Sequence, residues 1–317
     1  MNFSPDMQRK NRQRRITRTL LQWYTRQGRT LPWRNITNPY KILISEVMLQ
    51  QTQVARVLIK YPEFLRKFPT LRLLAQAKQR DVVIAWQGMG YNNRAVRLHQ
   101  FAETVVRFHG GRLPRTEEAL LALPGIGRYT ANALLSAAFA VDTPVVDVNV
   151  RRFLSRLLWK MRSVLETKGE SEIWSAAEDL LPKGRAYDWN QALMDMGATI
   201  CTARAPGCEV CPVAVFCLSR RTMNGPISSN PRKKESSLSG VPNRMYRGRI
   251  IEVLRKVNGS GTRGKGIRAD VLGRTIYARF SDRNAVWLQR LLEGLVKDGL
   301  ILTKGNGTLK TRKVTLA

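Results

Sequence analysis

The stretch LPGIGRYTANALL, residues 123–135, decides the fold. A Pro-Gly-Ile-Gly turn separates two segments in which apolar residues recur at helical spacing. Gly125 and Gly127 have no side chain, so the turn can come close to another backbone. The amide groups that open the second segment at Arg128 can face a phosphate, as the start of a helix does. The pattern therefore predicts two helices joined by a hairpin that holds a nucleic-acid backbone without reading its sequence.

The charge of the chain favours the same kind of partner. The 317 residues include 54 Lys and Arg against 23 Asp and Glu, a formal net charge of +31. A surface this basic attracts polyanions, of which nucleic acid is the common one. No apolar stretch approaches the length of a membrane span, and the charged beginning MNFSPDMQRKNRQRR lacks the apolar core of a signal peptide. We therefore expect a cytoplasmic, nucleoid-associated protein without a membrane partner.

Composition divides the chain into regions. Residues 1–15 are basic and polar and predict a loose arm, whereas short breakers separate helical patterns up to residue 220. Residues 221–243 are rich in Ser, Pro, Asn and Gly and predict a linker. Residues 244–317 contain three helical segments and two strand-like runs around a Gly-Asn-Gly turn, with 17 Lys and Arg against 5 Asp and Glu. We expect a mainly α protein with a small, basic, winged-helix-like domain at residues 244–317.

All four cysteines of the chain lie in one run, CTARAPGCEVCPVAVFC, residues 201–217. A reducing compartment disfavours disulfides, so a metal centre is the better interpretation. The spacing has one close pair, Cys208 and Cys211, whereas structural zinc sites typically have two such pairs. Cys201, Cys208, Cys211 and Cys217 are therefore predicted ligands of one centre, with a [4Fe–4S] cluster favoured over zinc.

Two acidic residues lie in apolar surroundings. Asp147, in TPVVDVNVRRFLSRL, precedes a helical segment, so it either caps that helix or opposes a developing positive charge; this stretch by itself favours the cap. Glu46, in LISEVMLQQT, would have a raised pKa if buried and could then serve as a general acid. The ordinary alternative for Glu46 is an exposed glutamate on a helix.

In this order, the motifs resemble those of the helix-hairpin-helix DNA glycosylases of the endonuclease III superfamily, most closely the MutY-type adenine glycosylases. The resemblance spans residues 20–217 and also rests on LPWR (31–34), GMGYNNRAVRL (88–98) and NQALMDMGATIC (190–201). It implies a glycosylase core at residues 1–220 with two helical lobes. These would be a six-helix lobe at 31–140 and an iron–sulfur lobe formed by 16–30 with 141–220.

The resemblance also implies roles for individual residues. Asp147 would stabilise the oxocarbenium-like sugar, and Glu46 would protonate the departing adenine at N7. Tyr129 and Asn149 would complete the catalytic pocket. The residues expected to line the base pocket or wedge into the duplex are Arg34, Leu49, Gln51 and Tyr91. The hairpin residues expected to hold the DNA backbone are Gly125, Ile126, Gly127 and Arg128. The four cysteines would carry a [4Fe–4S] cluster.

The implied activity is adenine removal in base excision repair. A monomer would bind double-stranded DNA with a mismatch or damaged base and flip out an adenine opposite 8-oxoguanine or guanine. It would then hydrolyse the N-glycosidic bond and leave an abasic site, a reaction that needs two carboxyls with different protonation states. Tyr129 stands where bifunctional relatives have a Schiff-base lysine, so a monofunctional enzyme is expected.

Two departures from the adenine-type pattern keep alternatives open. Val148 replaces the usual glycine after the catalytic aspartate, as in thymine glycosylases, and Asn92 replaces a frequent aromatic residue after Tyr91. Residues 244–317 do not resemble the Nudix-like domain of adenine enzymes; they would bind DNA or dock a repair-protein partner. The alternatives are therefore a thymine or uracil glycosylase for G·T or G·U mismatches, and a non-catalytic iron–sulfur DNA-binding protein.

Overall fold

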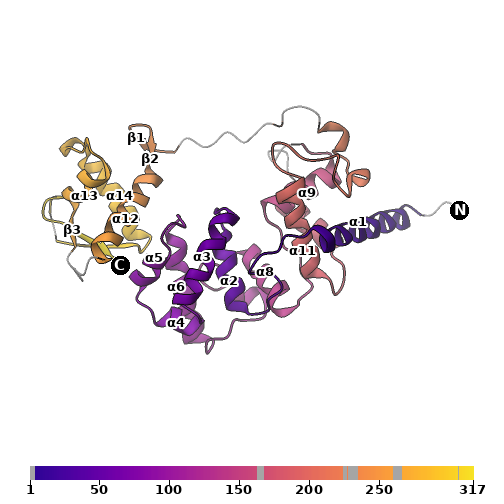
Figure 1. Ribbon diagram of the computed structural model, residues 1–317, viewed down its shortest axis with the longest axis horizontal. Helices are drawn as coiled ribbons and strands as arrows, with labels where there is room; N and C mark the ends of the chain where they lie inside the picture. Colours follow the sequence, from indigo (N-terminus) through magenta and orange to yellow (C-terminus); the bar gives the residue numbers. More distant parts are fainter. Residues whose placement is uncertain (1–3, 163–167, 224–226, 228–234, 260–265, 306) are drawn as a thin grey trace. The chain divides into compact units, whose positions relative to one another are not determined.

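The computed structural model describes residues 4–162, 168–223, 227, 235–259, 266–305 and 307–317 (Figure 1). The described chain is mainly helical, as predicted, and it forms no strand before residue 237. The helices up to residue 195 are α1 (Pro5–Gln27), α2 (Pro39–Leu49), α3 (Val54–Lys67), α4 (Leu71–Gln76), α5 (Gln79–Ala85), α6 (Asn93–Phe108), α7 (Glu117–Leu121), α8 (Arg128–Phe139), α9 (Val148–Trp159), α10 (Glu170–Asp179) and α11 (Ala186–Asp195). A π-helical turn, η2 (Met196–Ile200), and two short 3₁₀ turns, η3 (Ala214–Phe216) and η4 (Arg220–Thr222), follow.

Helix α1 corrects the prediction of a loose arm at residues 1–15 from Pro5 onward, whereas residues 1–3 lie outside the described residues. The helix begins at Pro5, and the Oγ of the preceding Ser4 accepts a hydrogen bond from the amide of Met7 at 3.4 Å. Proline suits the first helical position because its fixed φ is helical and its missing N–H would have no partner there. Asp6 adds a negative charge to the first turn, which the helix dipole favours. Capping at the N-terminus therefore stabilises a helix here despite the many positive charges of the segment.

Contacts between Cα atoms divide the chain into two compact units. The first comprises residues 1–43, 115–122 and 126–232, and the second comprises residues 44–114, 123–125 and 233–317. The division predicted from the sequence, with a core at 1–220, a linker at 221–243 and a domain at 244–317, stays a prediction. Much of that linker, residues 224–226 and 228–234, lies outside the described residues.

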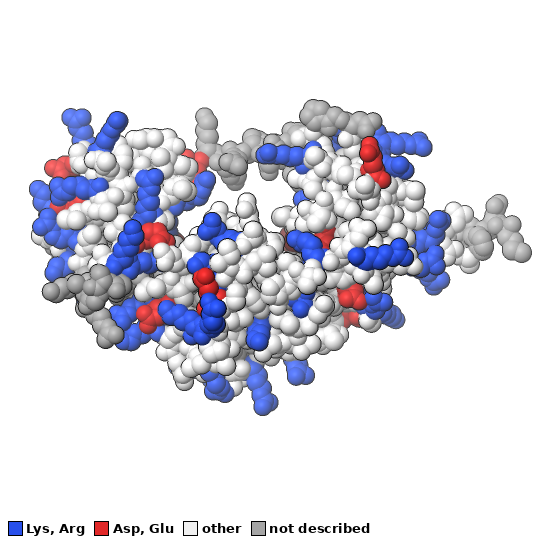
Figure 2. Space-filling view, viewed as in Figure 1, with Lys and Arg blue, Asp and Glu red and all other residues white. Residues whose placement is uncertain are grey.

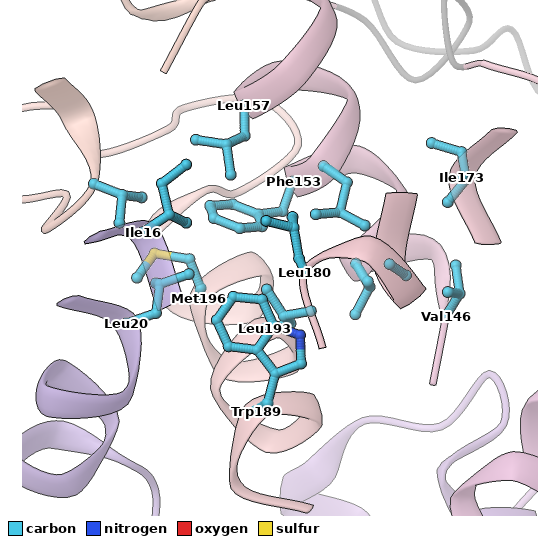
Figure 3. Close-up of a cluster of buried hydrophobic side chains, with 14 of the residues drawn as sticks. Ile16, Leu20, Val146, Phe153, Leu157, Ile173, Leu180, Trp189, Leu193 and Met196 are labelled. Atoms are coloured by element: carbon cyan, nitrogen blue, oxygen red, sulfur yellow. The ribbon is translucent and has the colours of Figure 1, made fainter. Parts of the chain in front are cut away.

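The core of the first unit joins α1 to the helices around Asp147 (Figure 3). Ile16 and Leu20 of α1 are fully buried in a cluster with Phe153 of α9 and with Trp189 and Leu193 of α11. Burying side chains of this size contributes about 1.5–3 kcal/mol each. The apolar spacing of ITRTLLQWYTRQ thus fixes α1 against the two helices that flank the candidate site.

The end of the chain has winged-helix topology, as predicted. Its elements after a short hairpin, β1 (Ser237–Leu238) and β2 (Val241–Pro242), are α12 (Asn243–Gly259), β3 (Ile267–Arg268), α13 (Ala269–Ile276), the 3₁₀ turn η5 (Asp282–Asn284), α14 (Ala285–Lys297), β4 (Ile301–Lys304) and β5 (Lys313–Leu316). The three strands form an antiparallel sheet in the order β3-β5-β4, with Ile301 opposite Leu316. Asn306, in the predicted Gly-Asn-Gly turn, lies outside the described residues.

The surface carries far more positive than negative charge. Figure 2 shows Lys and Arg side chains distributed over all described parts of the visible face, with few acidic residues among them. None of the described helices is both long and apolar enough to cross a bilayer.

Candidate active site and cysteine loop

The predicted hairpin forms between α7 and α8. Gly125 has φ +77°, in the left-handed region that favours glycine, and a Cβ there would lie 3.1 Å from the Cβ of Arg97. Gly127 is the N-cap of α8, and a Cβ at this position would meet nothing within 4 Å. The turn backbone that opens α8 is therefore exposed, as contact with a phosphate would require.

Two residues fasten this hairpin to its surroundings. The Nδ2 of Asn132 donates to the Oε1 of Glu117 at 2.8 Å and to the carbonyl of Arg128 at 3.0 Å, which ties α8 to α7. The guanidinium of Arg128 lies 3.9 Å from the ring centroid of Trp174 on α10, and its Nε is 3.5 Å from Glu117. Ile126 is buried beneath the turn. These contacts anchor α8, the helix that follows the hairpin, to α7 and α10.

Asp147 is the N-cap of α9, so the capping geometry predicted from the sequence is present. Its Oδ1 accepts hydrogen bonds from the amides of Asn149 and Val150 at 2.8 and 2.7 Å. Its Oδ2 accepts one from the Nδ2 of Asn149 at 2.7 Å. Three N–H donors therefore orient a half-buried carboxylate, and the cap itself supplies the fixed geometry that a catalytic role would need.

Asn190 of α11 fixes the extended chain that leads to Asp147. Its Oδ1 accepts from the amide of Val145 at 3.0 Å, and its Nδ2 donates to the carbonyl of Thr143 at 2.9 Å and to the Oγ of Ser136 at 3.1 Å. The oxygen and the nitrogen of this buried side-chain amide therefore both have hydrogen-bond partners. Asp147 is therefore held by its own helix on one side and by α11 on the other.

The π-helical turn η2 packs directly on Asn149. A Cβ added to Gly197 would lie 2.7 Å from the Cβ of Asn149 and 2.8 Å from its carbonyl oxygen, so only glycine fits. The Nη2 of buried Arg152 donates to the Oδ1 of Asn149 at 2.9 Å and to the carbonyl of Gly197 at 2.5 Å. Its Nε donates to the carbonyl of Cys201 at 2.9 Å. Arg152 thus joins the loop of Asp147 to the start of the cysteine loop.

A second arginine of α9 organises the cysteine loop. Arg156, which is 2% exposed, donates to the carbonyls of Thr202 and Ala203 at 2.6 and 2.9 Å and to the Sγ of Cys201 at 3.4 Å. The loop therefore depends on α9 for its shape and its electrostatic environment.

The four predicted ligands line one cavity together with Arg156 and Arg220. Burial raises the pKa of Cys211 to about 12, so a thiolate there would need a bound cation. Among the described residues, no three His, Cys, Asp or Glu side chains stand close enough together to chelate a single metal ion. Four soft sulfur donors around one cavity, beside two cations, nevertheless fit an anionic thiolate-held cluster.

Arg34 and Tyr129 have partners within the first unit. Arg34 is 8% exposed, and its Nη atoms donate to both carboxylate oxygens of Asp195 at 2.6 and 2.7 Å. Burial opposes the charge of Asp195, but hydrogen bonds from Arg34 and Arg29 outweigh it and hold the pKa of Asp195 below its ordinary value. The hydroxyl of Tyr129 donates to the Sδ of Met194 at 3.7 Å. The base-pocket role of Arg34 and the catalytic-pocket role of Tyr129 stay predictions.

Glu46 lies on α2, in the second unit. Only 8% of this residue is exposed, which excludes the ordinary alternative of an exposed helical glutamate. Leu49, the last residue of α2, is half-buried. The apolar sequence around Glu46 therefore predicted its environment correctly, and the general-acid role stays a prediction.

The two predicted wedge residues share an uncommon backbone conformation. Gln51 has φ +55° and Tyr91 has φ +43°, values that residues with a side chain rarely adopt. Both side chains are exposed, Tyr91 to 50%. Such strain costs about 1–3 kcal/mol and persists only where surrounding contacts impose it. The wedge role of both residues stays a prediction.

Buried Arg94 holds this conformation, a role that its sequence pattern did not predict. The side chain is 7% exposed and lies at the start of α6. Its donors reach acceptors at the end of α2 and in the loops of Gln51 and Tyr91, the two wedge loops, at 2.5 to 3.4 Å. These acceptors are the carbonyls of Val47, Met48, Gln50, Met89, Gly90 and Tyr91 and the hydroxyl of Thr52. Burial lowers the pKa of Arg94 to about 10, which still leaves it charged. An arginine in GMGYNNRAVRL gives no signal of burial, because its partners lie at other positions along the chain.

Comparison with known proteins gives the class of this fold and site. Residues 44–181 match the family of HhH-GPD superfamily base excision DNA repair proteins. Among solved structures, a thermostable thymine-DNA glycosylase superimposes with a TM-score of 0.62 at 31% identity, covering 67% of this chain and 98% of that one. Endonuclease III in a trapped covalent intermediate with DNA gives 0.57 at 24% identity, a likeness of fold.

Similarity to named enzymes assigns the chain to one family within this superfamily. The adenine DNA glycosylase of Mycobacterium tuberculosis H37Rv is 38% identical over 296 residues, which cover 91% of this chain and 90% of the relative. The mouse and human adenine DNA glycosylases are 42% and 41% identical over 68% and 71% of this chain. The chain belongs to the adenine DNA glycosylase family of this superfamily. It spans less than half of the mouse and human proteins, 44% and 42% of their lengths.

Proposed function

We propose that this chain is a monofunctional adenine DNA glycosylase of base excision repair. It binds double-stranded DNA as a monomer, flips out an adenine opposite 8-oxoguanine or guanine, and hydrolyses its N-glycosidic bond. The carboxylate of Asp147, oriented by three N–H donors at 2.7–2.8 Å, is the observation that carries the proposal. The net charge of +31 supports action in the cytoplasm at the nucleoid, where DNA is the prevailing polyanion.

In the proposed mechanism the two carboxyls have different roles. The sugar gains positive charge as the bond to adenine breaks, and the ionised carboxylate of Asp147 opposes that charge. Adenine is a poor leaving anion, so buried Glu46 donates a proton to its N7. Water then adds to the sugar and leaves an abasic site. Because position 129 is Tyr rather than Lys, no Schiff base forms there, and strand cleavage by β-elimination is not expected.

Two substitutions test these roles on labelled duplexes. Asp147→Asn should abolish adenine release and leave duplex binding unchanged, since asparagine caps a helix as well as aspartate does. Glu46→Gln should also abolish adenine release. Asp179→Asn and Glu178→Gln, made at exposed positions of α10, are matched controls that should retain wild-type rates. Adenine release by Glu46→Gln at the wild-type rate would refute the acid assignment.

A pyrimidine glycosylase is the second candidate, favoured by the 31% identity to a thymine-DNA glycosylase and by Val148. Duplexes with A opposite 8-oxoguanine, A opposite G, T opposite G and U opposite G separate the two functions after alkaline cleavage of abasic sites. Cleavage of the pyrimidine duplexes only would establish the alternative. In that case Glu46→Gln should spare activity, because a pyrimidine has no N7. No cleavage of any duplex would leave a non-catalytic DNA-binding protein.

We further propose that Cys201, Cys208, Cys211 and Cys217 hold a [4Fe–4S] cluster. Their shared cavity with Arg156 and Arg220 supports this assignment. When bound, the cluster would cross-link the loop after η2, which Arg152 and Arg156 connect to α9. Iron and sulfide analysis should give about four of each per chain, and Cys208→Ser should lower both. One zinc ion per chain and no iron would refute the cluster.

A further inference from the structure

Helix α12 of the winged-helix segment contacts α5 and the loop that carries Tyr91, all within the second unit. The Nε2 of Gln87 donates to the Oε2 of Glu252 at 2.9 Å, and the Nε2 of Gln79 donates to the carbonyl of Gly299 at 2.7 Å. Between these contacts lies Arg255, whose Nε and Nη2 donate to the carbonyl of Val83 at 3.1 and 2.7 Å. The winged-helix segment is thus hydrogen-bonded to the helical part of the unit at several points.

Arg255 is the buried centre of this contact. It is 5% exposed, and its Nη2 also donates to the Oδ1 of Asn92 at 2.8 Å. The carboxylate of Glu252, one turn earlier on α12, pairs with its Nη1. Burial lowers the pKa of Arg255, and Glu252 opposes this effect. Apart from Glu252, the acceptors of this guanidinium belong to α5 and the Tyr91 loop, so the residue is built for that contact.

The position of Asn92 connects this contact to the predicted wedge residue Tyr91. Asn92 directly follows Tyr91, the exposed wedge residue with a left-handed backbone. It is also the residue that replaces an aromatic of the adenine-type pattern, and its amide oxygen supplies the acceptor for Arg255. Arg94 holds the same loop through the carbonyl of Tyr91. The Tyr91 loop, residues 88–92, is therefore held by one arginine from α6 and by another from α12.

A groove runs between the Tyr91 loop and α12. Its lining includes Tyr91, Asn93 and the exposed cations Arg244, Arg249 and Lys256. An aromatic ring beside a row of cations is the combination that binds a nucleic-acid strand, because bases stack on the ring and phosphates pair with the cations. The groove is therefore suited to the strand that Tyr91 contacts.

We propose that Arg255 is a positioning residue that fixes the Tyr91 loop, so that the winged-helix segment sets the discrimination between bases opposite the excised adenine. The proposal rests on the proposed glycosylase function. Arg255 acts through Asn92 and the loop backbone and does not itself touch the DNA bases. Lys256, its neighbour on α12, contacts only the phosphate backbone in the groove. Because Arg255 and Lys256 carry the same charge, a difference between the effects of substituting them reflects their different contacts and not a loss of charge.

The test compares full-length wild type with Arg255→Met, Asn92→Ala, the double variant and Lys256→Ala. Methionine retains the buried aliphatic volume of Arg255 and removes its donors. The measurement is the single-turnover rate of adenine release from duplexes with A opposite 8-oxoguanine and A opposite C. Arg255→Met and Asn92→Ala should each reduce the ratio of the two rates about tenfold, and the double variant should reduce it no further, since both break one contact.

Lys256→Ala should weaken binding to all duplexes equally, lower the salt dependence of binding by about one counterion, and leave the ratio of rates unchanged. Ratios within twofold of wild type for Arg255→Met and Asn92→Ala would overturn the proposal. Additive effects in the double variant would do the same.

Hydrogen exchange without DNA separates this proposal from the proposed function. Amides of residues 88–92 should exchange at least tenfold faster in Arg255→Met and in Asn92→Ala than in wild type or Lys256→Ala. Unchanged exchange there would overturn the proposal even if adenine release is confirmed. Faster exchange in a protein that releases no adenine would support the positioning contact and refute the proposed function.

Discussion

Substitution of Gly197 by Ala tests whether the π-helical turn sets the geometry of the Asp147 carboxylate, to which we assign the catalytic role. The added Cβ would lie 2.7 Å from the Cβ of Asn149 and 2.8 Å from its carbonyl oxygen, whereas ordinary contacts begin near 3.4 Å. Both obstacles belong to a short side-chain stem and to backbone, so no rotamer change relieves them. The turn and the start of α9 must separate by about 0.7 Å at this point to restore ordinary contact.

The cost of this separation follows from packing energetics. Overpacking of this kind costs about 1–3 kcal/mol, and replacing glycine by alanine in a helix returns about 0.5–1 kcal/mol. A net loss of about 1–2 kcal/mol corresponds to a fall in Tm of about 2–8 °C in a unit of roughly 150 residues. The displaced Asn149 donates to the Oδ2 of Asp147, so the carboxylate moves with it. A misplacement approaching 1 Å at a reacting group lowers the rate about 100-fold.

The assay measures single-turnover adenine release 15 °C or more below the Tm of the variant, alongside thermal unfolding followed by circular dichroism. We expect Gly197→Ala to lower the rate 10- to 100-fold and to leave duplex affinity within threefold. The matched control is Gly169→Ala at the exposed N-cap of α10, where a Cβ would meet only the side-chain Oε2 of Glu172 at 3.4 Å, and this variant should keep the wild-type rate. A rate for Gly197→Ala within twofold of wild type, in a folded protein, would refute the packing argument.

Three further substitutions test stability and the tolerance of the site. Asp195→Asn removes the buried charge partner of Arg34 and Arg29 and should lower the free energy of unfolding by about 3–5 kcal/mol at pH 7. Because the folded-state pKa of Asp195 is lowered, this stabilisation is complete above its ordinary pKa near 4 and is lost as the pH falls through the folded value. The difference in Tm between wild type and variant should therefore narrow below about pH 4. Arg94→Lys cannot satisfy the carbonyls of both wedge loops and should lower the free energy of unfolding in urea by about 3 kcal/mol; an unchanged midpoint would contradict this. Val148→Gly should change stability by less than about 1 kcal/mol and adenine release by less than threefold, and a loss of all activity would show that valine is required.

The parts of the fold that follow from local pattern were predictable. Helical spacing predicted the helices, and the Gly-Ile-Gly turn predicted the hairpin, because the φ of +77° at Gly125 is a conformation that glycine adopts without steric cost. In the run KILISEVMLQQTQVARVLIKYPEFLRKF, residues 41–68, the apolar spacing is helical throughout, but the chain leaves the helix after Leu49 and forms the loop of Gln51 before α3. Non-glycine residues in the left-handed region give no sequence signal of this kind. The start of α1 did have a signal, Ser4 before Pro5, but the charge composition concealed it.

Buried arginines account for most of what the sequence did not predict at the site. Arg94, Arg152, Arg156 and Arg255 are each 7% exposed or less. A charged side chain is ordinarily placed at the surface, since burial without partners costs several kcal/mol. Here the partners are mostly backbone carbonyls of loops distant in sequence, and carbonyls are present at every position. No residue pattern therefore distinguishes these arginines from solvated ones, although together they fix the wedge loops and the cysteine loop.

The two departures from the adenine-type pattern have different structural meanings. Val148 is the first residue of α9, its side chain is 73% exposed, and a helical backbone does not require glycine. The hydrogen bonds to Asp147 come from Asn149 and Val150, so the residue between cap and donors can vary without disturbing the carboxylate. Asn92, in contrast, makes a specific contact with Arg255 on α12. The departure beside Asp147 thus leaves the capping geometry intact, whereas the departure beside Tyr91 supplies a hydrogen-bond acceptor for the winged-helix segment.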